Sequence, residues 1–341
     1  MKNKTSKILE AAFFFLIMLL TFYTVFAKND LRNIISSMGK LNPFYFFCAA
    51  ASAVFFVCME GFMIWQLLRL TEKGASLLRC FSYSFIGFFF SGITPSATGG
   101  QPAQLLAMKK DGLSLGSSTF ALMAVALFYK LILALLGMGI LFFWKNGLAG
   151  YLGNYMGLYY LGLFLNSLLV ALLILVMFHG SWMESLVLRI EHFCIKARLC
   201  KPSSKRKEAI HRLLSDYQET LRFLLENKLQ IFITAFCTLM QRCSLFLLTY
   251  FIYRGFGLSG HSPLLIMTLQ AAIYISVDML PLPGSQGISE IMYALIFSSV
   301  FAKPFLIPSM CVTRGLSFYF LLLVGGFMTV FYRFYSHKKQ M

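Results

Sequence analysis

The sequence has little charge for its length. Of its 341 residues, 13% are Asp, Glu, Lys or Arg, whereas 58% are apolar and the mean hydropathy is +0.73. Ordinary soluble domains are about 25% charged and about 45–50% apolar, so a soluble fold of one or two domains is excluded. Because about 20 apolar residues cross a bilayer as a helix, the length leaves room for about eight membrane segments. The composition predicts an all-α polytopic membrane protein with a single integral membrane domain over residues 1–341.

Signatures of metal and cofactor chemistry are also scarce. The five histidines are scattered without metal-ligand spacing, the eight cysteines form no CxxC pair, and GxxxxGK[ST] does not occur. Most of the cysteines lie in apolar segments and are expected to behave as small buried hydrophobic residues. We therefore expect no metal ion, no cofactor and no catalytic residue.

Six apolar runs are long enough to cross a bilayer as helices. They cover residues 8–26, 43–68, 116–144, 154–178, 229–253 and 305–333. The first run follows Lys2, Lys4 and Lys7, and we interpret it as an uncleaved transmembrane helix because so many further spans follow it. The sequence thus predicts about six full spans.

Two further apolar regions, 80–104 and 264–304, are interrupted by proline and glycine. The breaks read TPSATGGQP and PLPGSQG. Lipid cannot satisfy irregular backbone N–H and C=O groups, so such breaks persist at membrane depth where protein or a wet cavity surrounds them. This pattern favours two re-entrant helical hairpins, while two ordinary surface loops stay open as an alternative. The residues expected to shape the hairpins are Pro95, Gly99, Gly100, Pro283, Gly284 and Gly287.

The excess of basic residues, 30 Lys plus Arg against 13 Asp plus Glu, indicates orientation in the membrane. Most of these residues lie in short loops beside apolar runs, as the positive-inside rule requires, so we expect no nucleic-acid partner. The distribution of Lys and Arg supports a topology with both termini cytoplasmic and with the two hairpins entering from opposite faces. Opposed hairpins of this kind are typical of an inverted repeat, whose site lies near the midplane.

The polar stretch 179–228 contains ten Lys and Arg residues. From Ser204 to Asn227 its apolar residues recur with helical spacing, which predicts a cytoplasmic basic amphipathic segment. Two interpretations stay open: a helix lying on the lipid surface, and a connector packed on the bundle.

Six ionisable residues lie within the apolar regions. Each costs roughly 2.5–3.5 kcal/mol at the bilayer centre, so they are expected to pair or to line a hydrated cavity. A pocket holding both signs would suit a phospholipid headgroup, with the cations and helix ends holding phosphate. An ion or small-solute transporter would use the same residue types. The candidate substrate-binding residues are Arg314, Lys130, Arg242, Glu290, Asp278 and Glu60.

At its two breaks the chain resembles the flippase-like transmembrane domain of the lysylphosphatidylglycerol synthases, the multiple peptide resistance factor family. The resemblance rests on residues 94–102 followed by 108–112, on residues 282–290, and on Arg314 with Tyr319. It extends from the first span to the last. The match also adds Gln101 and Tyr319 to the candidate site, although many relatives carry an acid at the position of Gln101 and an arginine at that of Gln104.

The resemblance implies a flippase for phospholipid, or for another lipid-linked headgroup, in a bacterial inner membrane, with anionic or aminoacylated lipids as partners. Whether the chain forms homo-oligomers stays open. The full synthases append a soluble domain that transfers lysine from lysyl-tRNA to phosphatidylglycerol, and the chain ends at Met341 without that domain. Lysyl transfer, with its role in antimicrobial peptide resistance, would then need a separate lipid-modifying enzyme. It stays an alternative beside solute transport.

Overall fold

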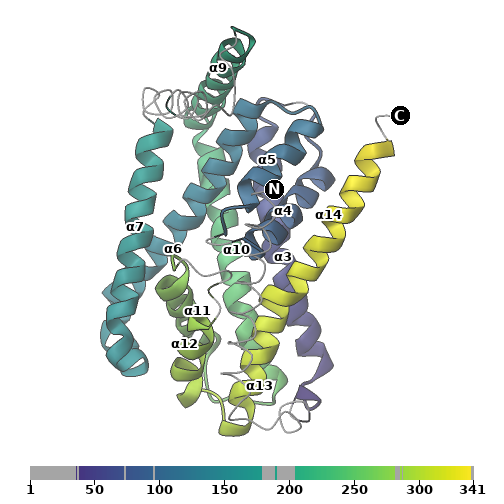
Figure 1. Cartoon of the computed structure of the whole chain (residues 1–341). Helices are drawn as coiled ribbons and strands as arrows, with labels where there is room; N and C mark the ends of the chain where they lie inside the picture. Colours follow the sequence, from purple (N-terminus) through teal and green to yellow (C-terminus); the bar gives the residue numbers. More distant parts are fainter. Residues whose placement is uncertain are drawn as a thin grey trace, which may run out of the picture.

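The computed structural model describes residues 38–72, 74–94, 97–178, 204–280 and 287–338, together with residues 36, 189 and 285. Every regular element in these ranges is a helix, which confirms the all-α prediction (Figure 1). The α-helices are α3 (Pro43–Leu68), α4 (Leu77–Gly92), α5 (Gly100–Lys110), α6 (Leu115–Leu152), α7 (Met156–Phe178), α9 (Ser204–Glu226), α10 (Lys228–Gly255), α11 (Pro263–Val277), α12 (Ile288–Ile296), α13 (Lys303–Arg314) and α14 (Leu321–Lys338).

Four stretches of the described chain are long and apolar enough to cross a membrane: Pro43–Leu68, Leu115–Met177, Lys228–Gly255 and Lys303–Tyr332. They contain all the predicted spans except 8–26, which lies outside the described residues. The second stretch holds two predicted spans, because α6 and α7 are separated by only the short 3-10 helix η2 (Gly153–Tyr155). These two helices pack side by side and so fold back on each other.

Each predicted break separates two short helices that pack together. Helix α4 contacts α5 around the first break, and α11 contacts α12 around the second. These helices have 16, 11, 15 and 9 residues, and at 1.5 Å per residue each is shorter than the ~30 Å hydrocarbon core. In Figure 1, α5 lies in the upper half of the molecule, whereas α11 and α12 lie in the lower half. In both regions the structure therefore has the predicted order of a short helix, a break and a second short helix.

The helix contacts divide the chain into two halves with similar packing, α3–α7 and α10–α14. Helix α3 packs against α10, the first helix of one half against the first of the other. Several further contacts correspond when the halves are exchanged: α4 packs on α14 as α11 packs on α7, and α5 packs on α6 as α12 packs on α13. Two structurally related halves would produce this pattern.

Helix α9 packs on the bundle instead of standing free. Tyr217 is buried and meets the Phe120 ring of α6 edge-on, with 5.4 Å between ring centroids. Gly116 lies so close to α9 that an added Cβ would be 2.4 Å from the Leu213 carbonyl oxygen. For residues 204–226 the structure thus favours the packed connector; most of 179–203 lies outside the described residues.

Gly100 permits the close packing of α4 and α5. A Cβ there would lie 2.0 Å from Ser91 Oγ and 2.8 Å from the Gly87 carbonyl oxygen. We expect Gly100→Ala to lower the free energy of unfolding by about 1–3 kcal/mol, because the backbone must shift. The control is Gly150→Ala on α6, where no atom lies within 4 Å of the new methyl group and helix propensity favours alanine. Equal thermal unfolding midpoints for the two variants in detergent would contradict this account of α4–α5 packing.

Candidate functional site

The first buried ion pair joins the two halves. Lys130 of α6 forms a salt bridge with Asp278, the residue that caps the C-terminus of α11, and both side chains are 15% exposed. Lys130 Nζ also lies 3.3 Å from Met279 Sδ. A cation beside the C-terminus of a helix interacts favourably with the helix dipole. This pair therefore connects α6 of one half to the end of α11 in the other.

The second ion pair lies at the start of α12. Arg314, the last residue of α13, donates from Nε to Glu290 Oε1 at 2.6 Å. Glu290 Oε2 accepts hydrogen bonds from the Gly287 backbone N–H at 2.7 Å and from the Ser289 hydroxyl at 2.8 Å. Both carboxylate oxygens are thus used, and Glu290 satisfies a backbone N–H that the helix start would otherwise leave unpaired.

The two ion pairs stand at opposite ends of the second break. Asp278 follows the last residue of α11, and Glu290 lies in the first turn of α12. Within the break, the Ser285 hydroxyl donates to the Val277 carbonyl at 3.0 Å. Gly287 has a φ of +84°, a backbone conformation that favours glycine. The break is therefore held to α6 by one pair and to α13 by the other.

Arg242 of α10 is the third buried cation, and its side chain is fully buried. Its guanidinium carbon lies 3.2 Å from the centroid of the Tyr129 ring, and Nη2 donates to the Tyr129 carbonyl at 3.3 Å. Nε and Nη1 have no hydrogen-bond partner among the residues that the structure describes. Like the Lys130 pair, this contact crosses between the two halves.

Two tyrosines lie close to these groups. Tyr274 of α11 lies near Arg242, Arg314 and Asp278 and forms a hydrogen bond with Ser317. Tyr129 lies near Arg242, Asp278 and Tyr274, and also near Glu60 of α3. Arg242 and Glu290 are buried and the other members are half-buried. We call these eight residues the buried charge cluster: Glu60, Tyr129, Lys130, Arg242, Tyr274, Asp278, Glu290 and Arg314.

The helix that follows the first break, α5, forms a hydrogen bond with Glu60 of α3. Gln104 of α5 donates from Nε2 to Glu60 Oε1 at 2.7 Å, and its side chain is buried. Thr94 Oγ1 accepts from the Gly99 backbone N–H at 2.9 Å and donates to the Phe90 carbonyl at 2.6 Å. The Thr94 hydrogen bonds therefore stabilise the break locally, and the Gln104–Glu60 hydrogen bond connects the helix after it to α3.

The remaining predicted site residues, Gln101 and Tyr319, lie outside the buried charge cluster. Gln101 is exposed on α5, so it is Gln104, one turn later, that reaches the cluster. Tyr319 is 37% exposed and interacts electrostatically with Arg314. Among the hairpin residues, Gly99, Gly100 and Gly287 border the helices α5 and α12, whereas Pro95, Pro283 and Gly284 lie outside the described residues.

Replacing Gln104 with leucine is expected to destabilise the protein by about 1–3 kcal/mol, because a buried carboxylate oxygen loses its hydrogen-bond donor. The matched control is Gln101→Leu on the same helix, where the amide is exposed and little change is expected. Chemical unfolding of the detergent-solubilised variants measures the difference. Equal stability of the two variants would show that the bond to Glu60 contributes nothing.

A π-helix, η5 (Gly315–Phe320), follows Arg314 directly and joins α13 to α14. Such segments are rare and frequently occur at functional sites. It contains Ser317, the partner of Tyr274. Hydropathy gives no signal for a π-helix, and the sequence predicts one uninterrupted span here.

Two short patterns known from enzymes occur in the chain, and their surroundings are wrong for catalysis. Residues 112–116 match GxSxG, but Ser114 caps the N-terminus of α6 and hydrogen-bonds Asp216, whereas a nucleophile elbow follows a strand. Residues 255–260 match GxGxxG but follow helix α10, whereas the dinucleotide fingerprint follows a strand. Neither pattern therefore indicates an enzyme.

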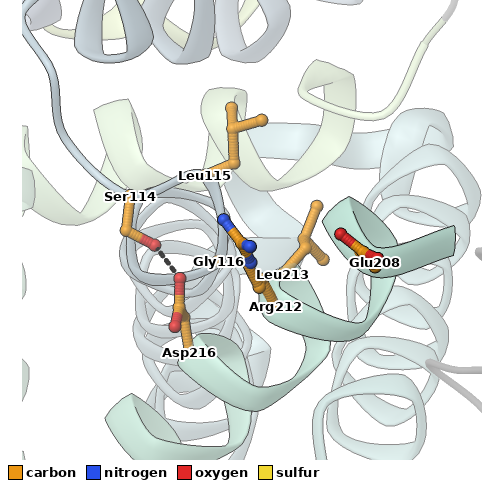
Figure 2. Close-up of a pocket in the computed structure, with 7 residues that line it drawn as sticks. All are labelled: Ser114, Leu115, Gly116, Glu208, Arg212, Leu213 and Asp216. Atoms are coloured by element: carbon orange, nitrogen blue, oxygen red, sulfur yellow. Dashed lines mark hydrogen bonds between the residues drawn. The ribbon is translucent and has the colours of Figure 1, made fainter. Parts of the chain in front are cut away.

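A shallow pocket of about 440 Å³ lies between α6 and α9, on a different part of the chain from the cluster (Figure 2). Figure 2 shows the Ser114 hydroxyl directed at Asp216 on one side, with Arg212 and Glu208 on the other. The lining shares no residue with the buried charge cluster. Its polar groups serve the docking of α9.

Comparison with known proteins identifies the family. The sequence matches the lysylphosphatidylglycerol synthase TM region over residues 8–325, which is most of the chain. Among curated proteins, no sequence matches it. The matched region includes both breaks and every residue of the buried charge cluster, and it makes the chain a multi-pass membrane protein. The protein belongs to the lysylphosphatidylglycerol synthase transmembrane-region family.

Proposed function

We propose that this protein moves a phospholipid between the two leaflets of a bacterial cell membrane and that the buried charge cluster binds the headgroup. The observation that carries the proposal is the position of the cluster. The Lys130–Asp278 pair and the Arg242–Tyr129 contact bridge the two halves of the bundle. The two ion pairs bracket a break between short helices. Transporters built from two repeats bind substrate at such an interface.

The chemistry of the cluster suits a headgroup with charges of both signs. Lysine and arginine form strong charge-assisted hydrogen bonds with phosphate. Carboxylates can likewise bind an ammonium group through charge-assisted hydrogen bonds. An anionic phospholipid, or an aminoacylated one with a free amine, presents these groups.

The proposal includes the arrangement in the membrane. The α4–α5 and α11–α12 pairs would be re-entrant hairpins entering from opposite faces, with both chain termini cytoplasmic. Their helices are too short to cross alone, and the distribution of Lys and Arg favours this orientation. Rocking of one half against the other would then expose the cluster to each leaflet in turn.

A leaflet-resolved assay in liposomes tests the proposal. Fluorescent phosphatidylglycerol and its lysyl derivative are placed in reconstituted vesicles, and a quencher outside reports the fraction in the outer leaflet over time. We expect movement that depends on the protein. Folded protein that moves neither lipid would refute phospholipid translocation, and solute uptake by the same vesicles would favour a solute transporter.

A further inference from the structure

The three cations of the cluster are not equivalent. Lys130 and Arg314 each have a carboxylate partner, Asp278 and Glu290. Among the residues that the structure describes, Arg242 pairs with no carboxylate and instead contacts the ring and the carbonyl of Tyr129. Its interaction with Asp278 is electrostatic, and that carboxylate is already bonded to Lys130.

A fully buried guanidinium with two unused nitrogens is expensive, because each loses its hydrogen bonds to water without replacement. Of its five N–H donors, the structure uses one, toward the Tyr129 carbonyl. Stacking on Tyr129 fixes the plane of the group but satisfies no N–H. An anionic group beside Arg242 would satisfy both Nε and Nη1.

We infer that Arg242, held against Tyr129, is the residue that binds the anionic group of the ligand, a phosphodiester or free phosphate, while Lys130 and Arg314 hold the break through their own carboxylates. This assignment rests on the proposed function and divides the cluster into one anion receptor and two structural ion pairs. Arg242 is fully buried, so an anion reaches it when neighbouring helices separate.

The alternative is that Arg242 merely clamps α10 to α6. The two roles predict opposite effects in the absence of ligand. Loss of a clamp lowers stability, whereas loss of an unsatisfied buried charge leaves the ligand-free protein as stable as before or more stable. Many binding sites trade stability for function in this way.

The test is the thermal unfolding midpoint of the purified full chain in detergent, titrated separately with phosphatidylglycerol and with inorganic phosphate. In the wild type, we expect phosphatidylglycerol or phosphate to raise the midpoint. Arg242→Gln and Arg242→Met remove the charge-assisted hydrogen bonds from Nε and Nη1 and should weaken the apparent affinity about tenfold or more. A response to phosphate alone identifies the free anion, and a response to lipid alone identifies the headgroup; either supports the inference.

The matched control is Arg254→Gln, at the far end of the same helix, which should respond as the wild type does. Arg242→Lys keeps the charge without the planar stack and should give a weaker response at unchanged ligand-free stability. The inference is wrong if the Arg242 variants show the wild-type rise of the midpoint with lipid or phosphate. It is also wrong if the Gln, Met and Lys variants all lose stability without ligand while their midpoint still rises with it.

The outcomes separate this inference from the proposed function. A wild type that binds the anion through Arg242 but moves no lipid refutes translocation and leaves the anion site standing. Lipid movement that persists at the wild-type rate in folded Arg242→Gln refutes the anion site and leaves translocation standing.

Discussion

Asp278→Asn is expected to lower the free energy of unfolding by about 3–5 kcal/mol. The substitution removes the charge that compensates Lys130, and the ammonium is left buried against Met279 and the end of α11. Breaking a buried ion pair from one side is strongly destabilising because the remaining charge is uncompensated. Chemical unfolding in detergent, followed by intrinsic fluorescence, measures the loss.

Two comparisons make this prediction specific. Replacing both partners, Lys130→Met with Asp278→Leu, should restore stability to within about 1–2 kcal/mol of the wild type, because a buried pair is often replaceable by apolar residues of similar volume. Glu226→Gln breaks the exposed Arg222–Glu226 pair on α9 and should change nothing measurable. If Asp278→Asn lowers the free energy of unfolding no more than Glu226→Gln does, the Lys130–Asp278 pair does not stabilise the fold as predicted.

Glu290→Ala is expected to destabilise the protein by a similar amount, about 3–5 kcal/mol, and to reduce lipid movement to the protein-free rate. It removes the partner of Arg314 and the acceptor of the Gly287 N–H at once. The start of α12 would then lose its cap, and a buried guanidinium would lose its carboxylate. Thermal unfolding and the liposome assay measure the two effects.

Glu290→Gln separates the two roles of this side chain. An amide oxygen still accepts one hydrogen bond, so part of the contacts to Gly287 or Arg314 remains while the charge is lost. We expect intermediate stability. Lys303→Ala, at the exposed N-terminal end of α13, is the control for lost charge on this helix. If both Glu290 variants unfold and move lipid as the wild type does, Glu290 is not part of the site.

Hydropathy and proline–glycine punctuation were sufficient to predict the helices and the breaks. Each described span is helical, although the span 305–333 is divided into α13, the π-helix η5 and α14. The helix pairs α4–α5 and α11–α12 flank the two breaks. These features are encoded locally, by the length of an apolar run or by residues that interrupt it. The relation between the halves shows in their packing more clearly than in their sequences, which share little identity.

The partners within the site could not be predicted, because pairing is a property of the fold. Lys130 and Asp278 are 148 positions apart in the chain. Gln101 and Gln104 have the same chemistry, and only the orientation of α5 decides that Gln104 meets Glu60. Likewise, the sequence places Arg242 within an apolar span, but only the structure shows that none of the described carboxylates forms an ion pair with it.

The most direct test of the account is lipid movement by the Lys130→Met, Asp278→Leu double variant in the leaflet-resolved assay. This variant should fold with near wild-type stability while lacking the ion pair that connects the two halves. We predict protein-dependent movement of phosphatidylglycerol by the wild type and movement at the protein-free rate with the folded double variant. Movement at the wild-type rate by that variant would contradict a role in translocation for the ion pair that connects the two halves.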